Sequence, residues 1–378
     1  MEPYTIRAAL PAELSAIMPL YDQSRQFMRD CGNHKQWIGG YPSRQLIEDD
    51  IRRGRCHVVC NGDEIAGVFA FVTGRDATYE HIEAGAWQED TRPYATLHRI
   101  ARRSDRHGIF KACIDWSRSH HTSLRIDTHE ANHVMQHLIG REGFRYCGII
   151  HIADGSPRHA YQMLDTRTLC EPLTAHIRQH ILPRYDAFDS AHRRDHALTV
   201  IQNSLDLAKH YDVEINMVYT IAAYHDIGLI AGRDRHHLVS AQMLLADKEL
   251  TTWFSGSQLH TMADAIEDHR ASSAHEPRSL YGRIVAEADR DIRPLTIIRR
   301  TIQYGLSHCP TLDQESHWQR TQAHLQEKYG EHGYLKLWLP ESPNAQALHA
   351  LRQLIADPDA LRTLFLQIYD EELHKTNN

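Results

Sequence analysis

Histidine and aspartate recur at the ends of apolar runs in the second half of the chain, where they could bind a metal ion. His225 and Asp226 are adjacent and follow the apolar run 215–223. His196 lies upstream of this pair, and Asp289 ends a later apolar run. Imidazole nitrogen and carboxylate oxygen suit a divalent cation of borderline or hard character. Because the chain contains 29 histidines, only their place in a pattern indicates a site.

This order of a histidine, a His-Asp pair and a later aspartate resembles the HD superfamily of metal-dependent phosphohydrolases. The resemblance implies a core ligand set for one ion: His196, His225, Asp226 and Asp289. In binuclear relatives two further histidines bind a second ion. His236 matches the first, because the usual small pair, Ser240 and Ala241, follows it, and His269 matches the second. The alternative for both is a surface position. For His260 we expect a surface position or a role in helix packing.

The resemblance implies hydrolysis of a small phosphorylated metabolite or nucleotide with one or two divalent ions (Fe, Mn, Zn, Ni or Mg). A bound ion lowers the pKa of water and neutralises charge on a phosphoryl oxygen. Asp226 would be catalytic by bridging two ions, and His192 is a candidate proton donor to the leaving group, with a helix-surface position as its alternative. Two other functions remain open. One is oxygenation, as in binuclear-iron relatives of this fold, and the other is a non-catalytic role as a ligand-sensing fusion.

The first half of the chain contains a second place suited to chemistry. A strand expected at 94–101 runs into a basic turn at 102–108, and a helix is expected at 109–120. The free N–H groups and the dipole of a helix N-terminus both favour an anion. The strand, the basic turn with its glycine, and the helix therefore predict an anion-binding site.

Over residues 1–165 this order of elements resembles the GNAT acetyltransferase superfamily. The resemblance rests on residues 98–101, on 127–129 with Asn132, on 143–150 and on 154–158. It implies N-acetyltransferase activity with acetyl-CoA, whose pyrophosphate would lie in the turn after the fourth strand. The residues assigned to this cofactor are Ile100, Arg103, Arg106, His107, Gly108, Ile109, Phe110 and Asn132.

Three positions depart from the GNAT pattern. Asp105 stands at the first position of the phosphate loop, where its charge would repel pyrophosphate. Phe110 stands at the last position, and its ring would hinder the close backbone approach that glycine allows. Ile139 stands where a tyrosine often acts as general acid. The alternative to acetyl transfer is therefore a sensing or scaffold role for this half.

The elements expected around the two sites indicate two domains. Short alternating strands and helices fill the first half, and helical periodicity dominates from residue 190 onward, with a central buried helix at 215–224. We expect an α/β GNAT-like mixed-sheet domain at 1–168. An all-α HD-type domain with a helical C-terminal extension is expected at 169–378.

Composition narrows the cellular setting. The net charge is −7, which makes a nucleic-acid polymer an unlikely partner. Seven scattered cysteines without CxxC spacing indicate reduced thiols, and the N-terminus lacks the pattern of a signal peptide. No apolar run approaches the roughly 20 residues that cross a bilayer. We expect a cytoplasmic protein with small-molecule partners, whose oligomeric state the sequence leaves open.

Overall fold

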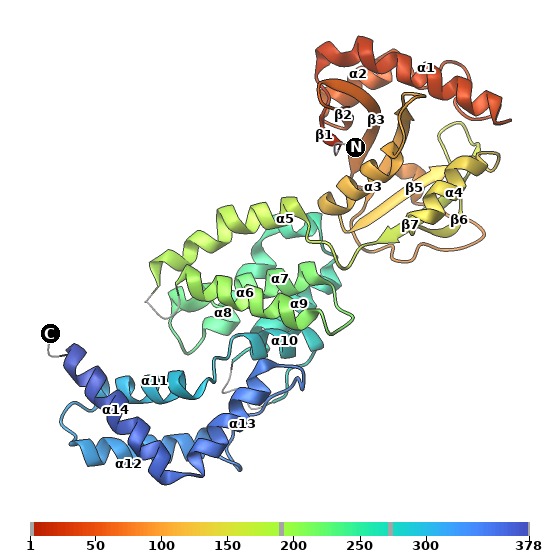
Figure 1. Cartoon of the computed structure of the whole chain (residues 1–378). Helices are drawn as coiled ribbons and strands as arrows, with labels where there is room; N and C mark the ends of the chain where they lie inside the picture. The colour runs from red at the N-terminus through yellow and green to blue at the C-terminus, as the bar shows by residue number, and fades with distance from the viewer. Residues whose placement is uncertain (1–3, 189–192, 271–274, 377–378) are drawn as a thin grey trace. The chain divides into compact units, whose positions relative to one another are not determined.

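The structure is a computed structural model that describes residues 4–188, 193–270 and 275–376. The chain divides into two compact units (Figure 1). The first comprises Met1–His176 and Asp247–Leu259, and the second comprises Ile177–Ala246 and His260–Asn378. A short segment of the first unit thus lies, in sequence, between parts of the second. The domain boundary at 168/169 stays a prediction.

A seven-stranded mixed sheet forms the centre of the first unit, in the order β1-β2-β3-β4-β5-β7-β6. Neighbouring strands are antiparallel except β4 and β5, which are parallel. The α/β mixed-sheet prediction is confirmed. The strands are β1 (Thr5–Ala8), β2 (Cys56–Asn61), β3 (Glu64–Thr73), β4 (Ala95–Arg102), β5 (Ser123–Thr128), β6 (Arg145–His151) and β7 (Pro157–Leu164).

Helices cover both faces of this sheet, so the sequences of its central strands are nearly continuous apolar runs. The helices of this unit are α1 (Leu14–Asp30), α2 (Arg44–Arg52), α3 (Ile109–His120), α4 (His133–Arg141) and α5 (Glu171–His176). One core cluster joins Phe69 and Leu97 of the sheet to Ile109 of α3. Another joins Val58 to Ile17 of α1. The hairpin between β2 and β3 turns at Gly62, whose φ of 59° suits glycine.

The two parallel strands separate near the middle of the sheet. Pairing is recorded for Ala95–Leu97 with Leu124–Ile126 and ends just before His98 and Asp127. On its other side β4 carries a bulge against β3, where Arg99 has a φ of 53°. A cavity of about 1020 Å³ lies in this unit and reaches from the turn before α3 to the ends of both strands. Non-glycine residues at positive φ gather at functional sites, which draws attention to this bulge.

The second unit is helical. After α5 the chain makes a π-helical turn, Ile177–Ile181, and a 3₁₀ turn, η4 (Leu182–Ala187). The helices that follow are α6 (Arg194–Ala208), α7 (Ile215–Tyr224), α8 (His236–Ala246), α9 (Gly256–Asp268), α10 (Leu280–Ala288), α11 (Pro294–His308), α12 (Gln314–Tyr329), α13 (Pro343–Ile355) and α14 (Pro358–Thr376). The last four share a core that includes Ile298, Leu325 and Phe365. Across the described residues, no helix combines the length and apolar character needed to cross a bilayer.

Candidate metal centre and coenzyme cavity

Helix α7 is buried along almost its whole length. Its apolar sequence has no polar face to keep in water, so the helix runs through the interior and its C-terminal end lies there too. His225 is the C-cap of α7, and Asp226 is the N-cap of the 3₁₀ turn η5 (Ile227–Ala231). Both side chains are buried. The predicted helix and its predicted polar end are therefore placed as expected.

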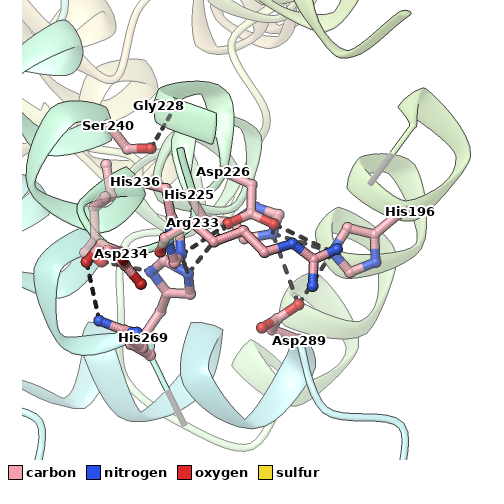
Figure 2. Close-up of polar contacts among 12 residues, drawn as sticks. His196, His225, Asp226, Gly228, Arg233, Asp234, His236, Ser240, His269 and Asp289 are labelled. Atoms are coloured by element: carbon pink, nitrogen blue, oxygen red, sulfur yellow. Dashed lines mark hydrogen bonds and ion pairs between the residues drawn. The ribbon is translucent and has the colours of Figure 1, made fainter. Parts of the chain in front are cut away.

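One oxygen of Asp226 faces a first group of histidines (Figure 2). Its Oδ2 lies 3.4 Å from Nε2 of His225 and 3.7 Å from Nε2 of His196. Asp289 completes this group, with Oδ1 at 3.1 Å from His196 and 3.7 Å from His225. The two imidazoles approach to 3.3 Å between their Nε2 atoms. Helices α6 and α7 and the end of α10 thus supply four metal-ligand atoms to one small volume.

The other oxygen of Asp226 faces a second group. Its Oδ1 lies 3.3 Å from Nε2 of His236 and 3.4 Å from Nε2 of His269. These two Nε2 atoms are 3.3 Å apart. His236 begins α8 and His269 follows α9, so this group draws on different helices from the first. Asp226 is the one residue that belongs to both potential ion-binding groups.

The hydrogen bonds of the histidines fit a metal site. In each of three rings Nδ1 lies against a backbone carbonyl oxygen, which can only accept a hydrogen bond. The pairs are His225 with Ala222 O at 2.7 Å, His236 with Arg233 O at 2.6 Å and His269 with Ile266 O at 2.5 Å. Nδ1 therefore carries the proton in the neutral ring, and Nε2 presents its lone pair toward Asp226. Metal-binding histidines are oriented in this way by their outer nitrogen.

The electric field at the cluster favours positive charge. Burial alone would lower the pKa of His225, but Asp226 and Asp289 together raise it to about 9. Burial opposes ionisation of Asp226, yet the neighbouring His225 and His269 hold the pKa of this carboxyl well below its usual range. A divalent cation would experience the same attraction. The donor set and its field therefore both fit a cation bound between the imidazoles.

Residues outside the predicted ligand set hold the cluster together. The hydroxyl of buried Tyr185, in η4, donates to Ala223 O at 3.0 Å and accepts from the backbone N–H of Asp226 at 3.3 Å. Asn203 of α6 donates to Ala288 O at 3.2 Å, which ties the helix of His196 to that of Asp289. Sequence patterns did not single out either residue. Each acts through a contact with the backbone of a distant element, which leaves no local signal.

A glycine brings η5 against α8. The N–H of Gly228 donates to Oγ of Ser240 at 2.9 Å (Figure 2). A Cβ on Gly228 would lie only 2.3 Å from the carbonyl oxygen of His236. The small residues at 228 and 240 thus allow the close contact that sets His236 opposite Asp226.

Two other histidines of this region, His237 and His260, do not join the two groups. His192 lies outside the described residues. His260 is exposed on α9, as expected for a residue without a ligand role. His237 packs edge-on against His236 at 5.4 Å between ring centroids, and its own nitrogens do not join the two groups. Among the nearby arginines, Arg270 donates to Asp234 O at 3.0 Å and Arg290 donates to Lys336 O at 2.5 Å.

Most of the residues assigned to acetyl-CoA line the cavity of the first unit. They are Ile100, His107, Gly108, Ile109, Phe110 and Asn132. The other two, Arg103 and Arg106, bond instead to Glu64, and Arg103 also pairs with Asp105 at 3.1 Å. Arg102 lines the cavity, and its guanidinium donates to carbonyls of the turn. These three bonds fix the shape of the turn before α3.

Two departures from the GNAT pattern acquire a physical meaning here. Phe110 belongs to the buried core cluster and also lines the cavity. The expectation that its ring hinders the coenzyme stays a prediction. Ile139 is fully buried in the same cluster, so any general acid must come from another residue.

Comparison with known proteins finds a family or a relative for each of the two parts of the chain. The HD domain family model matches residues 193–293. A GNAT family acetyltransferase from Streptococcus agalactiae is 34% identical over 43% of this chain and 95% of its own, with a TM-score of 0.40. The N-terminal part belongs to the GNAT family, and residues 193–293 form an HD domain. No curated protein matches the chain.

Two further solved structures extend the comparison. A ribosomal-protein-alanine N-acetyltransferase from Brucella melitensis is 18% identical over 42% of this chain and 99% of its own, with a TM-score of 0.30. A predicted HD superfamily hydrolase from an uncultured Thermotogales bacterium is 18% identical over 53% of this chain and 91% of its own, with a TM-score of 0.30. The HD domain indicates a metal-dependent hydrolase, and the GNAT domain indicates an acetyltransferase.

Proposed function

We propose that the HD domain hydrolyses a small phosphorylated metabolite or nucleotide with two divalent ions. The observation that carries this proposal is the division of Asp226 between two groups, with Oδ2 toward His196 and His225 and Oδ1 toward His236 and His269. A carboxylate with one oxygen in each of two ligand groups suits a bridge between ions. Two ions held close together can clamp both the attacking and the leaving oxygen of a phosphoryl displacement.

The roles of the protein groups follow from their contacts. Bound ions would supply an activated water and neutralise charge on the phosphoryl group. With ions bound, His225, His236 and His269 would offer the lone pair of Nε2, because backbone carbonyl oxygens hold their Nδ1 protons. The hydroxyl of Tyr185 links the backbone N–H of Asp226 to the carbonyl oxygen of Ala223 in α7. His192 remains the candidate proton donor to the leaving group.

Metal analysis of the full chain, prepared without chelator, tests the proposal, together with a panel of phosphorylated substrates. We expect about two ions per chain and release of inorganic phosphate. Asp226→Ala should lose both ions and the activity, since it removes the shared carboxylate. His269→Ala should retain about one ion. His260→Ala is the matched control, an exposed histidine of the same region, and should retain both.

Several results would contradict this proposal. A wild-type chain that never holds more than one ion, with His236 and His269 both dispensable, would reduce the site to His196, His225, Asp226 and Asp289. Consumption of oxygen by an iron-loaded chain, without phosphate release from any substrate, would support the oxygenase alternative. Full metal occupancy without either activity would support a sensing role.

A second function, acetyl transfer from acetyl-CoA, is proposed for the first unit. One cavity borders both the turn at Gly108 and the bulged residues Arg99 and Ile100. A coenzyme would need such a cavity if its pyrophosphate lies at the turn and its thioester lies where the strands separate. Gly108 is the N-cap of α3 with a φ of 78°, so a helix N-terminus borders the same cavity. Calorimetric titration of the full chain with acetyl-CoA tests it. The absence of binding at millimolar coenzyme would reduce this unit to a scaffold.

A further inference from the structure

A smaller cavity lies in the helical region that follows α12. Its volume is about 530 Å³, and small-molecule sites typically measure roughly 300–1,000 Å³. Its lining residues come from the irregular segment 335–338 and from α13: Leu335, Lys336, Leu337, Trp338, Ala345, Leu348, His349 and Arg352. None of them belongs to the metal-ligand groups or to the coenzyme cavity.

Two anchored walls form this cavity. Positions 345, 348, 349 and 352 are three or four residues apart, so they share one face of α13. The other wall begins where the backbone N–H groups of Tyr334 and Leu335 donate to Glu327 O at 3.1 Å and Lys328 O at 3.0 Å. Leu335 and Leu348 are both buried in the core that the last four helices share. The cavity is therefore a fixed part of the fold.

The polar side chains of the cavity are all basic. Lys336 and His349 are exposed, and Arg352 is half-buried. No lining residue is acidic, and in the part of the chain that the structure describes none of these three pairs with a carboxylate. Other arginines of this region, Arg299 and Arg362, do pair with glutamates. In a chain of net charge −7, three such groups around one cavity favour an anion.

The apolar lining suits an aromatic ring. Trp338 and Leu337 are half-buried and line the cavity. Aromatic pairs stack or meet edge to face, which adds to the free energy gained by burying their surface. Arg352 donates through Nε to Tyr329 O at 3.2 Å, which orients its guanidinium. An oriented guanidinium matches the paired oxygens of a carboxylate or a phosphoryl group.

The irregular segment also holds the end of α10 that carries Asp289. The backbone N–H of Trp338 donates to Oε2 of Glu287 at 3.2 Å. The backbone carbonyl of Lys336 accepts from Arg290 at 2.5 Å. These two contacts lie on either side of Asp289 in the chain. A ligand that stabilises this segment therefore also stabilises the position of Asp289.

We propose that this cavity binds a small organic anion with an aromatic ring, and that its binding slows loss of the metal ion held by Asp289. The basic side chains recognise the charge, and Trp338 recognises the ring. The effect on the metal rests on the ion binding proposed for the HD domain, whereas binding of the anion does not. Such coupling is reciprocal, so bound metal also tightens binding of the anion.

Titration of the full chain, prepared without chelator and followed by tryptophan fluorescence, tests the binding. Phenylphosphonate and benzoate are the probes, because they represent phosphoryl and carboxyl anions and neither is a phosphate ester. Methylphosphonate lacks the ring, and benzyl alcohol lacks the charge. Both should bind more weakly than phenylphosphonate. Trp338→Phe keeps the backbone N–H that contacts Glu287 and should lose most of the fluorescence change.

A second variant locates the charge recognition. Lys336→Ala keeps the carbonyl that contacts Arg290 and should weaken phenylphosphonate binding by about tenfold or more, because it removes a charged contact. His332→Ala is the matched control, since His332 is exposed and does not line the cavity. Its affinity for the probe should equal that of wild type.

Transfer of bound metal to a coloured chelator tests the effect on the metal centre. With saturating phenylphosphonate the transfer should be about fivefold slower in wild type and unchanged in Lys336→Ala. A phosphonate also binds metal ions directly. Equal slowing in both chains would place the effect at the metal itself and overturn the coupling.

The outcomes keep this site apart from the proposed hydrolase. No fluorescence change at millimolar probe would overturn the site, as would equal affinity for methylphosphonate or benzyl alcohol. Affinity of Lys336→Ala within about twofold of wild type would overturn its role in recognition. A chain that binds the probes but holds no metal would retain the site and lose both the proposed metal centre and the coupling.

Discussion

Replacing Gly228 with alanine should separate the two halves of the metal cluster. The new Cβ would lie 2.3 Å from the carbonyl oxygen of His236 and 2.5 Å from the backbone nitrogen of Ser240. Both are backbone atoms, so no side-chain rotation relieves the clash. Ordinary contact begins near 3.4 Å, so the start of α8 must move by about 1 Å relative to η5.

A displacement of this size exceeds what a metal ligand tolerates. Ligand distances vary by only about 0.2 Å around their ideal values. His236 would lose its place opposite Asp226, whereas His196, His225 and Asp289 lie on elements other than α8. We therefore expect Gly228→Ala to retain about one ion per chain and to lose most hydrolytic activity. Overpacking of this kind also destabilises a fold by about 1–3 kcal/mol.

Metal content by mass spectrometry, measured beside thermal unfolding, provides the assay. Gly256→Ala is the matched control, because a Cβ on Gly256 meets no atom within 4 Å. It should keep two ions and an unchanged melting temperature. If Gly228→Ala folds, binds two ions and hydrolyses substrate like wild type, then the Gly228–Ser240 contact does not position His236 and the reasoning fails.

Two further predictions concern buried groups. Tyr185→Phe removes the hydroxyl that contacts the N–H of Asp226 and the carbonyl of Ala223, so it should destabilise the chain by about 1–3 kcal/mol. Thermal unfolding measures this loss. Tyr304→Phe is the control, because Tyr304 is exposed. Burial, aided by Arg92, lowers the pKa of His121 to about 4, below its value in the unfolded chain. The unfolded state therefore binds more protons between pH 6.5 and 4, and stability should fall as pH drops through this window, by up to about 3 kcal/mol. Urea unfolding at a series of pH values should show a shallower decline in His121→Gln, and an identical decline would contradict the assignment.

Local patterns located the elements well. The helix at 215–224 was predicted from an apolar run followed by polar residues, and α7 spans Ile215–Tyr224. The helix at 109–120 was predicted with the bounds that α3 has. Both follow from periodicity and end signals that lie within a few residues. The resemblance to the HD superfamily brought together six candidate ligands that the fold also places in one cluster.

Contacts between distant elements were beyond the sequence. The hydroxyl of Tyr185 contacts the backbone of Asp226, and Asn203 of α6 contacts the backbone of Ala288 in α10. A side chain bound to the backbone of a distant element leaves no periodic pattern in the sequence. Phe110 is a further example. The loop pattern did not indicate that this residue also belongs to the buried core cluster.

The connectivity of the two units limits how the chain can be divided into separately expressed fragments. Residues Asp247–Leu259 belong to the first unit although the second unit surrounds them in sequence. Within that segment Asp247 bonds to His176 at 2.8 Å, and the ring of Trp253 lies 6.0 Å from that of the same histidine. A fragment that ends at residue 176 would therefore leave part of its own unit in the discarded piece. No single cleavage point therefore leaves both units intact.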